Sequence, residues 1–188
     1  ISEMLLNPGK AFTYNGSQYT YPAVKLIYNA GNNAYSHQQD LNELARAVKG
    51  VDTIICQEPW WNGSSRWADI VLAATTTVER NDISSAGTYS IDKVYAMKQV
   101  VAPQNDALDD FEIFRRLSAL CGIEYAFTEG KTQMDYVKEA YAASSAAAHM
   151  PFEQFWKEGM ARIPVPPAAQ KWVRHSDFRA DPAKHPLH

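Results

Sequence analysis

The sequence has few of the features that assign a protein to a class at first sight. It contains only two cysteines, Cys56 and Cys121, and their wide separation excludes a CxxC redox or zinc motif. Its five histidines are scattered and form neither an HExxH nor an HxH pattern. No apolar run approaches the roughly 20 residues that a membrane-spanning helix needs, and no signal peptide is present. We therefore expect no membrane span and no metal ligands within this chain.

The chain also lacks an excess of charge of one sign. It carries 18 Lys and Arg against 21 Asp and Glu, a net charge of −3, which gives no reason to expect nucleic acid as a partner. Its 188 residues, 46% of them hydrophobic, suffice for one domain with a core. The chain begins with Ile1 rather than Met, so we expect it to be a piece of a longer protein. Cys56 and Cys121 both end apolar segments, and both are predicted to be buried.

Alternating strands and helices between residues 24 and 82 organise the chain. Apolar segments predict three strands, at residues 24–28, 51–56 and 69–73. Leu44 and Val48 lie on one face of a helix between the first two strands, and this helix is expected to open near residues 37–40. The pattern predicts a three-layer α/β/α sheet, mainly parallel and Rossmann-like. Ligands of such sheets bind beyond the carboxyl ends of the strands.

Other segments carry weaker patterns. Residues 12–21 hold an Asn-Gly pair between aromatic residues, which suits a hairpin or an irregular connection equally well. A loop is expected from residue 84, and a strand within residues 91–101. Asp106 is suited to cap the helix that follows it. The proline-rich residues 164–188 are typical of a linker toward a missing C-terminal domain, which leaves one α/β domain at residues 1–163.

A polar turn follows the first predicted strand, at residues 31–37. It holds Asn33 and His37 before a helix N-terminus, where unpaired backbone N–H groups and the helix dipole favour an anion such as phosphate. Both side chains can donate hydrogen bonds to such an anion. A structural role suits the same residue types, with Asn33 capping the turn and His37 packing against the loop.

A second polar pair, Gln57 and Glu58, follows the second strand. In nucleotide-binding α/β folds an acidic residue at this place commonly bonds the ribose hydroxyls, and a carboxylate equally suits the N1–H and 2-amino edge of guanine. The alternative is an exposed polar pair before Pro59. The sequence lacks a GxGxxG fingerprint. For Trp60 and Trp61 we expect packing against the sheet edge rather than the lining of a cofactor trench.

Charged residues also follow the third strand and open a later helix. Arg80 lies in a polar cluster at residues 79–82, and its planar fork suits phosphate or a carbonyl-rich ring, unless the cluster is merely solvated. Asp109 and Asp110 lie in the first turn of a helix, where capping accounts for at least one of them. No Ser-His-Asp, Cys-His or paired-carboxylate arrangement is present. The residues therefore predict a nucleotide-type crevice without a catalytic centre.

Several segments resemble one known family. They are residues 30–40 (AGNNAYSHQQD), 68–83 (ADIVLAATTTVERNDI), 95–103 (YAMKQVVAP), 127–131 (FTEGK) and 152–156 (FEQFW). Together they resemble the molybdopterin oxidoreductases, and within them the branch of dimethyl sulfoxide, trimethylamine N-oxide and biotin sulfoxide reductases. The likeness extends over nearly the whole chain. The branch usually has Pro where Ala73 stands, a departure that concerns the local turn and not the fold.

The resemblance implies a cofactor and a role for each candidate residue. The family holds molybdenum as bis(molybdopterin guanine dinucleotide) molybdenum, and this chain is expected to be part of one α/β domain that grips one dinucleotide. The expected cofactor contacts are, in chain order, Asn33, His37, Gln57, Glu58, Arg80 and Asp110. The first two are expected to meet the phosphate or pterin region. The next two are expected to meet the guanosine, and the last two to complete the guanosine site.

The resemblance also implies an activity for a longer parent protein. The parent is expected to reduce a small S- or N-oxide, with electrons from a donor such as a c-type cytochrome. Its serine ligand to molybdenum and its remaining domains lie outside this chain, so the chain alone is expected to be inactive. A periplasmic location is expected, with the cytoplasm as the alternative. Two other interpretations stay open, a parent of the formate dehydrogenase or nitrate reductase type and a stand-alone nucleotide-binding module.

Overall fold

The structure, a computed structural model, describes residues 1–85, 92–167 and 173–185. Packing contacts divide the chain into two compact units. Unit 1 comprises Ile1–Asn81 and Gln99–Gln133, and unit 2 comprises Asp82–Lys98 and Met134–His188. None of the helices among the described residues combines the length and the apolar character needed to cross a membrane. The domain boundary expected between residues 163 and 164 stays a prediction.

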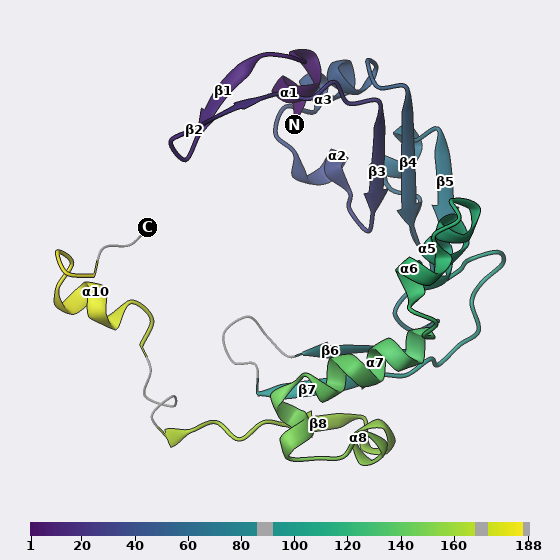
Figure 1. The fold of residues 1–188 in the computed structure, drawn as a ribbon, viewed down its shortest axis with the longest axis vertical. Coiled ribbons are helices and arrows are strands. Elements are labelled where there is room, and N and C mark those ends of the chain that lie inside the picture. The colour runs from purple at the N-terminus through teal and green to yellow at the C-terminus, as the bar shows by residue number, and fades with distance from the viewer. Residues whose placement is uncertain (86–91, 168–172, 186–188) are drawn as a thin grey trace. The chain divides into compact units, whose positions relative to one another are not determined.

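Unit 1 is built around a parallel sheet of three strands in the order β3-β4-β5 (Figure 1). Its elements are α1 (Ser2–Leu6), β1 (Ala11–Tyr14), β2 (Ser17–Thr20), β3 (Leu26–Ala30), α2 (Ala34–His37), α3 (Leu41–Val48), β4 (Thr53–Glu58), α4 (Gly63–Trp67), β5 (Ile70–Ala73), α5 (Asp110–Leu120) and α6 (Glu124–Thr128). In the register, Ile55 of β4 lies beside Tyr28 of β3 and Ile70 of β5. The three predicted strands and their parallel direction are confirmed.

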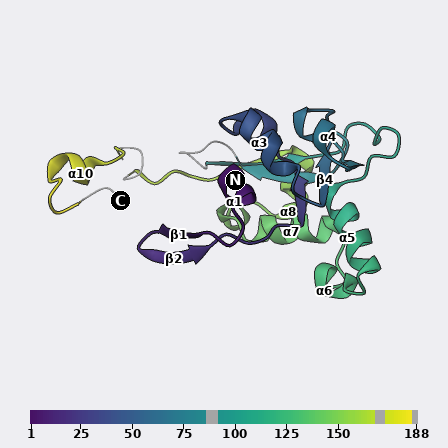
Figure 2. The same cartoon turned by 90° about the horizontal axis from the view of Figure 1, so that it is seen from above.

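Helices contact both faces of this sheet within unit 1 (Figure 2). Leu44 of α3 belongs to a buried cluster against which Ile27 of β3 packs. Successive side chains of a strand point to opposite faces, and the next residue, Tyr28, places its ring 5.5 Å from that of Phe114 on α5. The expected three-layer, Rossmann-like domain reaches beyond what these three strands establish and stays a prediction.

Residues 11–20 form a two-stranded antiparallel hairpin of β1 and β2. Asn15 and Gly16 connect the strands, and both have positive φ, 49° and 78°. A two-residue hairpin turn of type I′ needs positive φ at both positions, and Asn-Gly is the pair that adopts it most readily. Of the two interpretations left open for this segment, the hairpin is therefore the correct one.

The helix expected to open near residues 37–40 is confirmed as α3, and a short helix that was not predicted precedes it. A single turn, α2, comes first, and α3 begins only at Leu41. Asp40 is the N-cap of α3, and its carboxylate accepts a hydrogen bond from the backbone N–H of Glu43 at 2.9 Å. Because this cap sets the start of the longer helix, His37 lies at the end of α2 and not at the N-terminus of α3.

The prediction that Asp106 caps helix α5 is wrong. Asp109 is the N-cap of this helix. The Asp109 carboxylate accepts from the backbone N–H of Glu112 at 2.8 Å. The residue before it, Leu108, continues the sheet, since it forms a parallel bridge to Ala74 just beyond β5. Backbone pairing with the sheet therefore holds this segment extended and delays the helix.

The two cysteines differ in exposure. Cys56 of β4 is fully buried, as predicted. Cys121 is exposed, so the prediction for it is wrong. It is the C-cap of α5, between the exposed Leu120 and the turn at Gly122, whose φ is +73°.

Unit 2 contains a separate antiparallel sheet in the order β6-β7-β8. Its elements are β6 (Asp82–Ser85), β7 (Lys93–Met97), α7 (Gln133–Ala142), the 3-10 helix η1 (Ser145–Ala148), α8 (Phe152–Glu158), β8 (Met160–Arg162) and α10 (Ser176–Ala180). The sequence predicted a loop where β6 forms, although residues 86–87 of that loop lie outside the described residues. It predicted β7 within residues 91–101, of which residue 91 is not described. Part of the expected linker is helical, at α10, and its residues 168–172 and 186–188 are not described.

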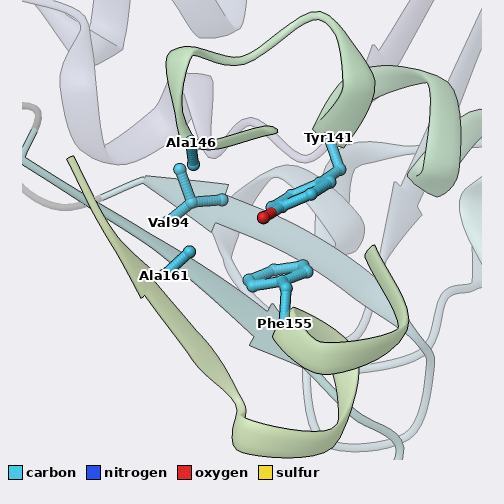
Figure 3. Packing of buried hydrophobic residues seen from close by; sticks show 5 residues of the cluster. All are labelled: Val94, Tyr141, Ala146, Phe155 and Ala161. Atoms are coloured by element: carbon cyan, nitrogen blue, oxygen red, sulfur yellow. The ribbon is translucent and has the colours of Figure 1, made fainter. Parts of the chain in front are cut away.

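The core of unit 2 is a stacked pair of aromatic rings (Figure 3). The ring centroids of Tyr141 and Phe155 lie 4.2 Å apart with an interplanar angle of 12°. The Tyr141 hydroxyl donates to the carbonyl oxygen of Met150 at 2.7 Å, so its polar end is satisfied. Val94 and Ala161 bring the sheet to the same cluster. This cluster ties α7 and α8 to the antiparallel sheet.

Replacing Phe155 by alanine is expected to destabilise unit 2 by about 3–5 kcal/mol, because the neighbours only partly fill the cavity left against Tyr141. Urea denaturation followed by near-ultraviolet circular dichroism measures the change. Tyr125→Ala is the control, since this ring is exposed and its loss should change the free energy of unfolding by about 0.5 kcal/mol or less. Equal effects of the two substitutions would contradict the assigned core.

Candidate functional site

An open pocket of about 350 Å³ lies at the carboxyl ends of β4 and β5 in unit 1. Gln57 and Glu58 reach it from the end of β4, Arg80 from the segment after β5, and Asp110 from the first turn of α5. Parallel strands end at the same edge of a sheet, so residues far apart in the sequence meet there. The structure thus brings together four of the six predicted site residues.

The side chain of Gln57 is fully buried and links the sheet to α5. Its Oε1 accepts from the Tyr28 hydroxyl, and its Nε2 donates to Asp110 Oδ1, both at 2.6 Å. Burial, and then the charge of Asp110, raise the pKa of Tyr28, which keeps its hydroxyl a donor. The two partners therefore fix the orientation of the amide, and the amide fixes Asp110.

Glu58 is half-buried at the end of β4 and places a second carboxylate in the pocket. Its Oε1 accepts from Asn62 Nδ2 at 3.1 Å. Burial raises the pKa of Glu58, and the charge of Asp110 raises it further. The charge of Asp110 therefore disfavours the charged form of Glu58, and a ligand with N–H donors would relieve this repulsion.

The two charged residues Glu79 and Arg80 that follow β5 have different roles. Arg80 lines the pocket and donates from Nη1 to the carbonyl oxygen of Thr75 at 2.8 Å. Glu79 instead accepts from the backbone N–H and the hydroxyl of Thr76, both at 2.7 Å, and from the backbone N–H of Gln104 at 2.9 Å. These hydrogen bonds lower the pKa of Glu79. Glu79 thus stabilises the loop after β5, and Arg80 places a positive charge at the pocket.

Asn33 and His37 are absent from the described residues that line this pocket. Asn33 is half-buried, and its Oδ1 accepts from the backbone N–H of Ser64 at 3.2 Å and from the Ser64 hydroxyl at 3.1 Å. Its Nδ2 donates to the hydroxyl of Ser36. His37 is exposed at the last residue of α2. The Asn33 side chain thus ties α2 to α4, without a capping hydrogen bond of its own to the α2 backbone.

Among the lining residues that were not predicted to belong to the site, two are informative. Trp60 lines the pocket and is 67% exposed, while its neighbour Trp61 is 66% exposed, so the predicted packing of this pair against the sheet edge is wrong. Thr75 also lines the pocket, and its buried Oγ1 has no hydrogen-bond partner among the described residues. Its place directly after β5, at the same edge as Gln57 and Glu58, was the available signal.

The pocket offers hydrogen bonds rather than a reaction centre. Its carboxylates accept, its guanidinium donates, and the Thr75 hydroxyl can do either. In the part of the chain that the structure describes, no three His, Cys, Asp or Glu side chains converge to hold a metal ion. The arrangement is that of a binding site for an organic group with both N–H donors and acceptor oxygens.

The sequence profile of the molybdopterin oxidoreductase family matches residues 4–120, which is more than half of the chain. The chain belongs to the molybdopterin oxidoreductase family. Membership implies a cofactor of molybdenum and molybdopterin. The pocket fits an organic part of such a group, because Thr75 Oγ1 is buried without a partner among the described residues and two neighbouring carboxylates have acceptor capacity to spare.

Three curated relatives in this family are similar over the whole chain. They are a trimethylamine-N-oxide reductase of Haemophilus influenzae at 46% identity, a dimethyl sulfoxide/trimethylamine N-oxide reductase of Cereibacter sphaeroides at 44%, and a biotin sulfoxide reductase of Cereibacter sphaeroides at 41%. The resemblance to this branch of the molybdopterin oxidoreductases is confirmed. The chain spans about a quarter of each relative, 24%, 23% and 25% of its length.

One solved structure, the acetylene hydratase from Pelobacter acetylenicus, has a similar fold. The TM-score is 0.59, and the match covers 78% of this chain and 19% of that one. Sequence identity is 20%, so this likeness concerns the fold alone.

Replacing Glu58 by glutamine is expected to change the pH dependence of stability. The pKa of Glu58 is raised above its ordinary value of 4.5. The native state therefore holds this proton to higher pH than the unfolded state, and the free energy of unfolding falls as pH rises from about 4.5 through the raised pKa. Glutamine has no titratable carboxyl group, so the free energy of unfolding of the Glu58→Gln variant should fall less over the same range.

Urea denaturation at a series of pH values measures this difference. Glu153→Gln, which changes an exposed carboxylate on α8, is the control and should leave the profile of the unsubstituted protein unchanged. If the profiles of Glu58→Gln and the unsubstituted protein coincide, the raised pKa of Glu58 is wrong.

Proposed function

We propose that this chain is a cofactor-binding domain of a molybdenum-dependent S- or N-oxide reductase, and that it is inactive alone. The parent reduces trimethylamine N-oxide, dimethyl sulfoxide or biotin sulfoxide by oxygen-atom transfer. The names of three relatives at 41–46% identity over the whole chain support this substrate class. A domain fragment fits the quarter of their length that the chain spans.

One observation carries the cofactor assignment, namely that Glu58, Arg80 and Asp110 reach a single pocket from three parts of unit 1. The carboxylates suit the N1–H and 2-amino donors of guanine, and the planar fork of Arg80 suits a phosphate or a carbonyl oxygen. The volume of about 350 Å³ lies at the low end for small-molecule sites and suits a nucleoside. The pocket takes the guanosine end of a molybdopterin guanine dinucleotide, with Gln57 holding Asp110 in place.

Asn33 and His37 serve the phosphate or pterin region of the same cofactor. His37 is exposed and able to donate to a phosphate oxygen. Asn33 acts by holding the turn after β3, because its oxygen is already bonded to Ser64. When bound, the molybdenum cofactor supplies the oxygen-atom transfer and the two-electron redox change, and the residues of this chain bind and orient its dinucleotide.

The surroundings of the domain follow from the same proposal. The three-stranded sheet is part of a three-layer, Rossmann-like domain that other parts of the parent complete. A donor such as a c-type cytochrome supplies the electrons, in anaerobic respiration. The parent works in the periplasm, with the cytoplasm as the alternative. The names of the relatives favour this parent over one of the formate dehydrogenase or nitrate reductase type and over a stand-alone module.

Replacing Arg80 by glutamine in the full-length parent is expected to lower cofactor occupancy about tenfold or more, because a hydrogen bond to a charged group contributes roughly 1.5–3 kcal/mol. Occupancy is measured as molybdenum by mass spectrometry and as GMP released by acid hydrolysis, each per mole of purified protein. Arg46→Gln is the matched control, since Arg46 is exposed on α3 and outside the pocket.

The outcomes separate the parts of this proposal. A parent that carries neither molybdenum nor GMP would rule it out. Molybdenum without GMP would leave a reductase whose cofactor has no guanine nucleotide. An Arg80→Gln variant with the same content of both as Arg46→Gln would remove Arg80 from the site.

A further inference from the structure

Trp60 lines the pocket with a side chain that is largely exposed in the described part of the chain. It lines the pocket beside Glu58 and also an adjoining cavity of about 510 Å³. The residue is 67% exposed, and no stacked ring or cation contacts its side chain among the described residues. Trp67, by contrast, stacks on Tyr35 with ring centroids 5.3 Å apart and an interplanar angle of 9°. Packing within unit 1 thus accounts for Trp67 and leaves the exposure of Trp60 unexplained.

The backbone that carries Trp60 is firmly held. Its carbonyl oxygen accepts from the backbone N–H of Asn62 at 2.8 Å and from the hydroxyl of Ser65 at 3.1 Å. Ser65 is itself buried, and Pro59 restricts the backbone on the other side. A large apolar ring exposed on a fixed backbone loses little conformational freedom when a ligand packs against it.

We propose that Trp60 stacks on the planar base of the nucleotide bound in the pocket. This inference rests on the proposed function and adds a residue to it. Glu58, two residues earlier, accepts hydrogen bonds from the edge of the base, while the ring of Trp60 packs on the face of the base. Stacking is indifferent to the kind of base, because every base has a π-face. Trp60 therefore contributes to the affinity for any base, and Glu58 contributes the specificity for guanine.

The neighbouring residue provides a matched control. Trp61 is 66% exposed, nearly the same as Trp60, but is absent from the described lining of the pocket. Removal of either indole deletes a similar exposed apolar surface. A change in nucleotide affinity that depends only on the loss of this surface should therefore be the same for both variants. An effect through stacking should appear for Trp60 alone.

The test uses the full-length parent as apoenzyme, produced in cells that cannot make the cofactor, with GDP and ADP as probes in titration calorimetry. Trp60→Ala is expected to raise the Kd of both nucleotides by the same factor, about tenfold. Trp60→Phe keeps a ring and should stay within about threefold of the unsubstituted protein. Trp61→Ala should leave both Kd values unchanged, and Glu58→Gln should weaken GDP more than ADP.

The outcomes distinguish this inference from the proposed function. If the unsubstituted apoenzyme binds no GDP and the holoenzyme releases no GMP, the proposed function fails. If GDP binds but Trp60→Ala binds it as tightly, or if the two tryptophan variants weaken binding and lower the Tm equally, stacking by Trp60 is ruled out. Should Trp60→Ala fail to fold, the comparison of Trp60→Leu with Trp60→Phe replaces it. Equal Kd values for these two variants overturn the inference.

Discussion

The buried side chain of Gln57 joins the parallel sheet to helix α5, and the pocket depends on this link. Its amide accepts from Tyr28 and donates to Asp110. A buried amide that loses one of these partners is left unsatisfied, at a cost of about 1–3 kcal/mol. This penalty holds the first turn of α5 against the end of β4. The carboxylate of Asp110 is thereby fixed beside Glu58, although 51 residues separate them in the sequence.

The sequence was sufficient to locate the pocket because local rules decide its main parts. The apolar runs give the strands, parallel strands end at one edge, and polar residues directly after them converge there. This argument brings Glu58 and Arg80 to one edge, where both line the pocket. Asp110 lines it too, but only the family resemblance pointed to that residue. These local rules do not place His37, because the N-cap at Asp40 starts the long helix after it. The exposure of Trp60 was not predictable either, since it depends on which neighbours reach the ring.

Long-range pairing accounts for the other differences. Asp106 and Asp109 are equally good caps by residue type, and the choice falls to Asp109 because Leu108 still pairs with the backbone beyond β5. In unit 2, strand β8 consists of only three residues, Met160–Arg162, and pairs with β7 more than sixty residues earlier. So short a segment has no periodicity of its own. Its strand character comes from its partner and from the packing of Ala161 in the core.

On the proposed function, the charges of the pocket bear on which end of a dinucleotide it would receive. The pKa of Glu58 is raised partly by the charge of Asp110, so the two carboxylates already repel each other. A phosphate placed beside them would add a third negative group, whereas the N–H edge of a base would be attracted to both. These charges therefore support the proposed arrangement, in which the base lies next to the carboxylates and the phosphates lie toward Arg80 or beyond the pocket. On the same proposal, phosphates beyond the pocket would need donors there, and the exposed His37 is one candidate.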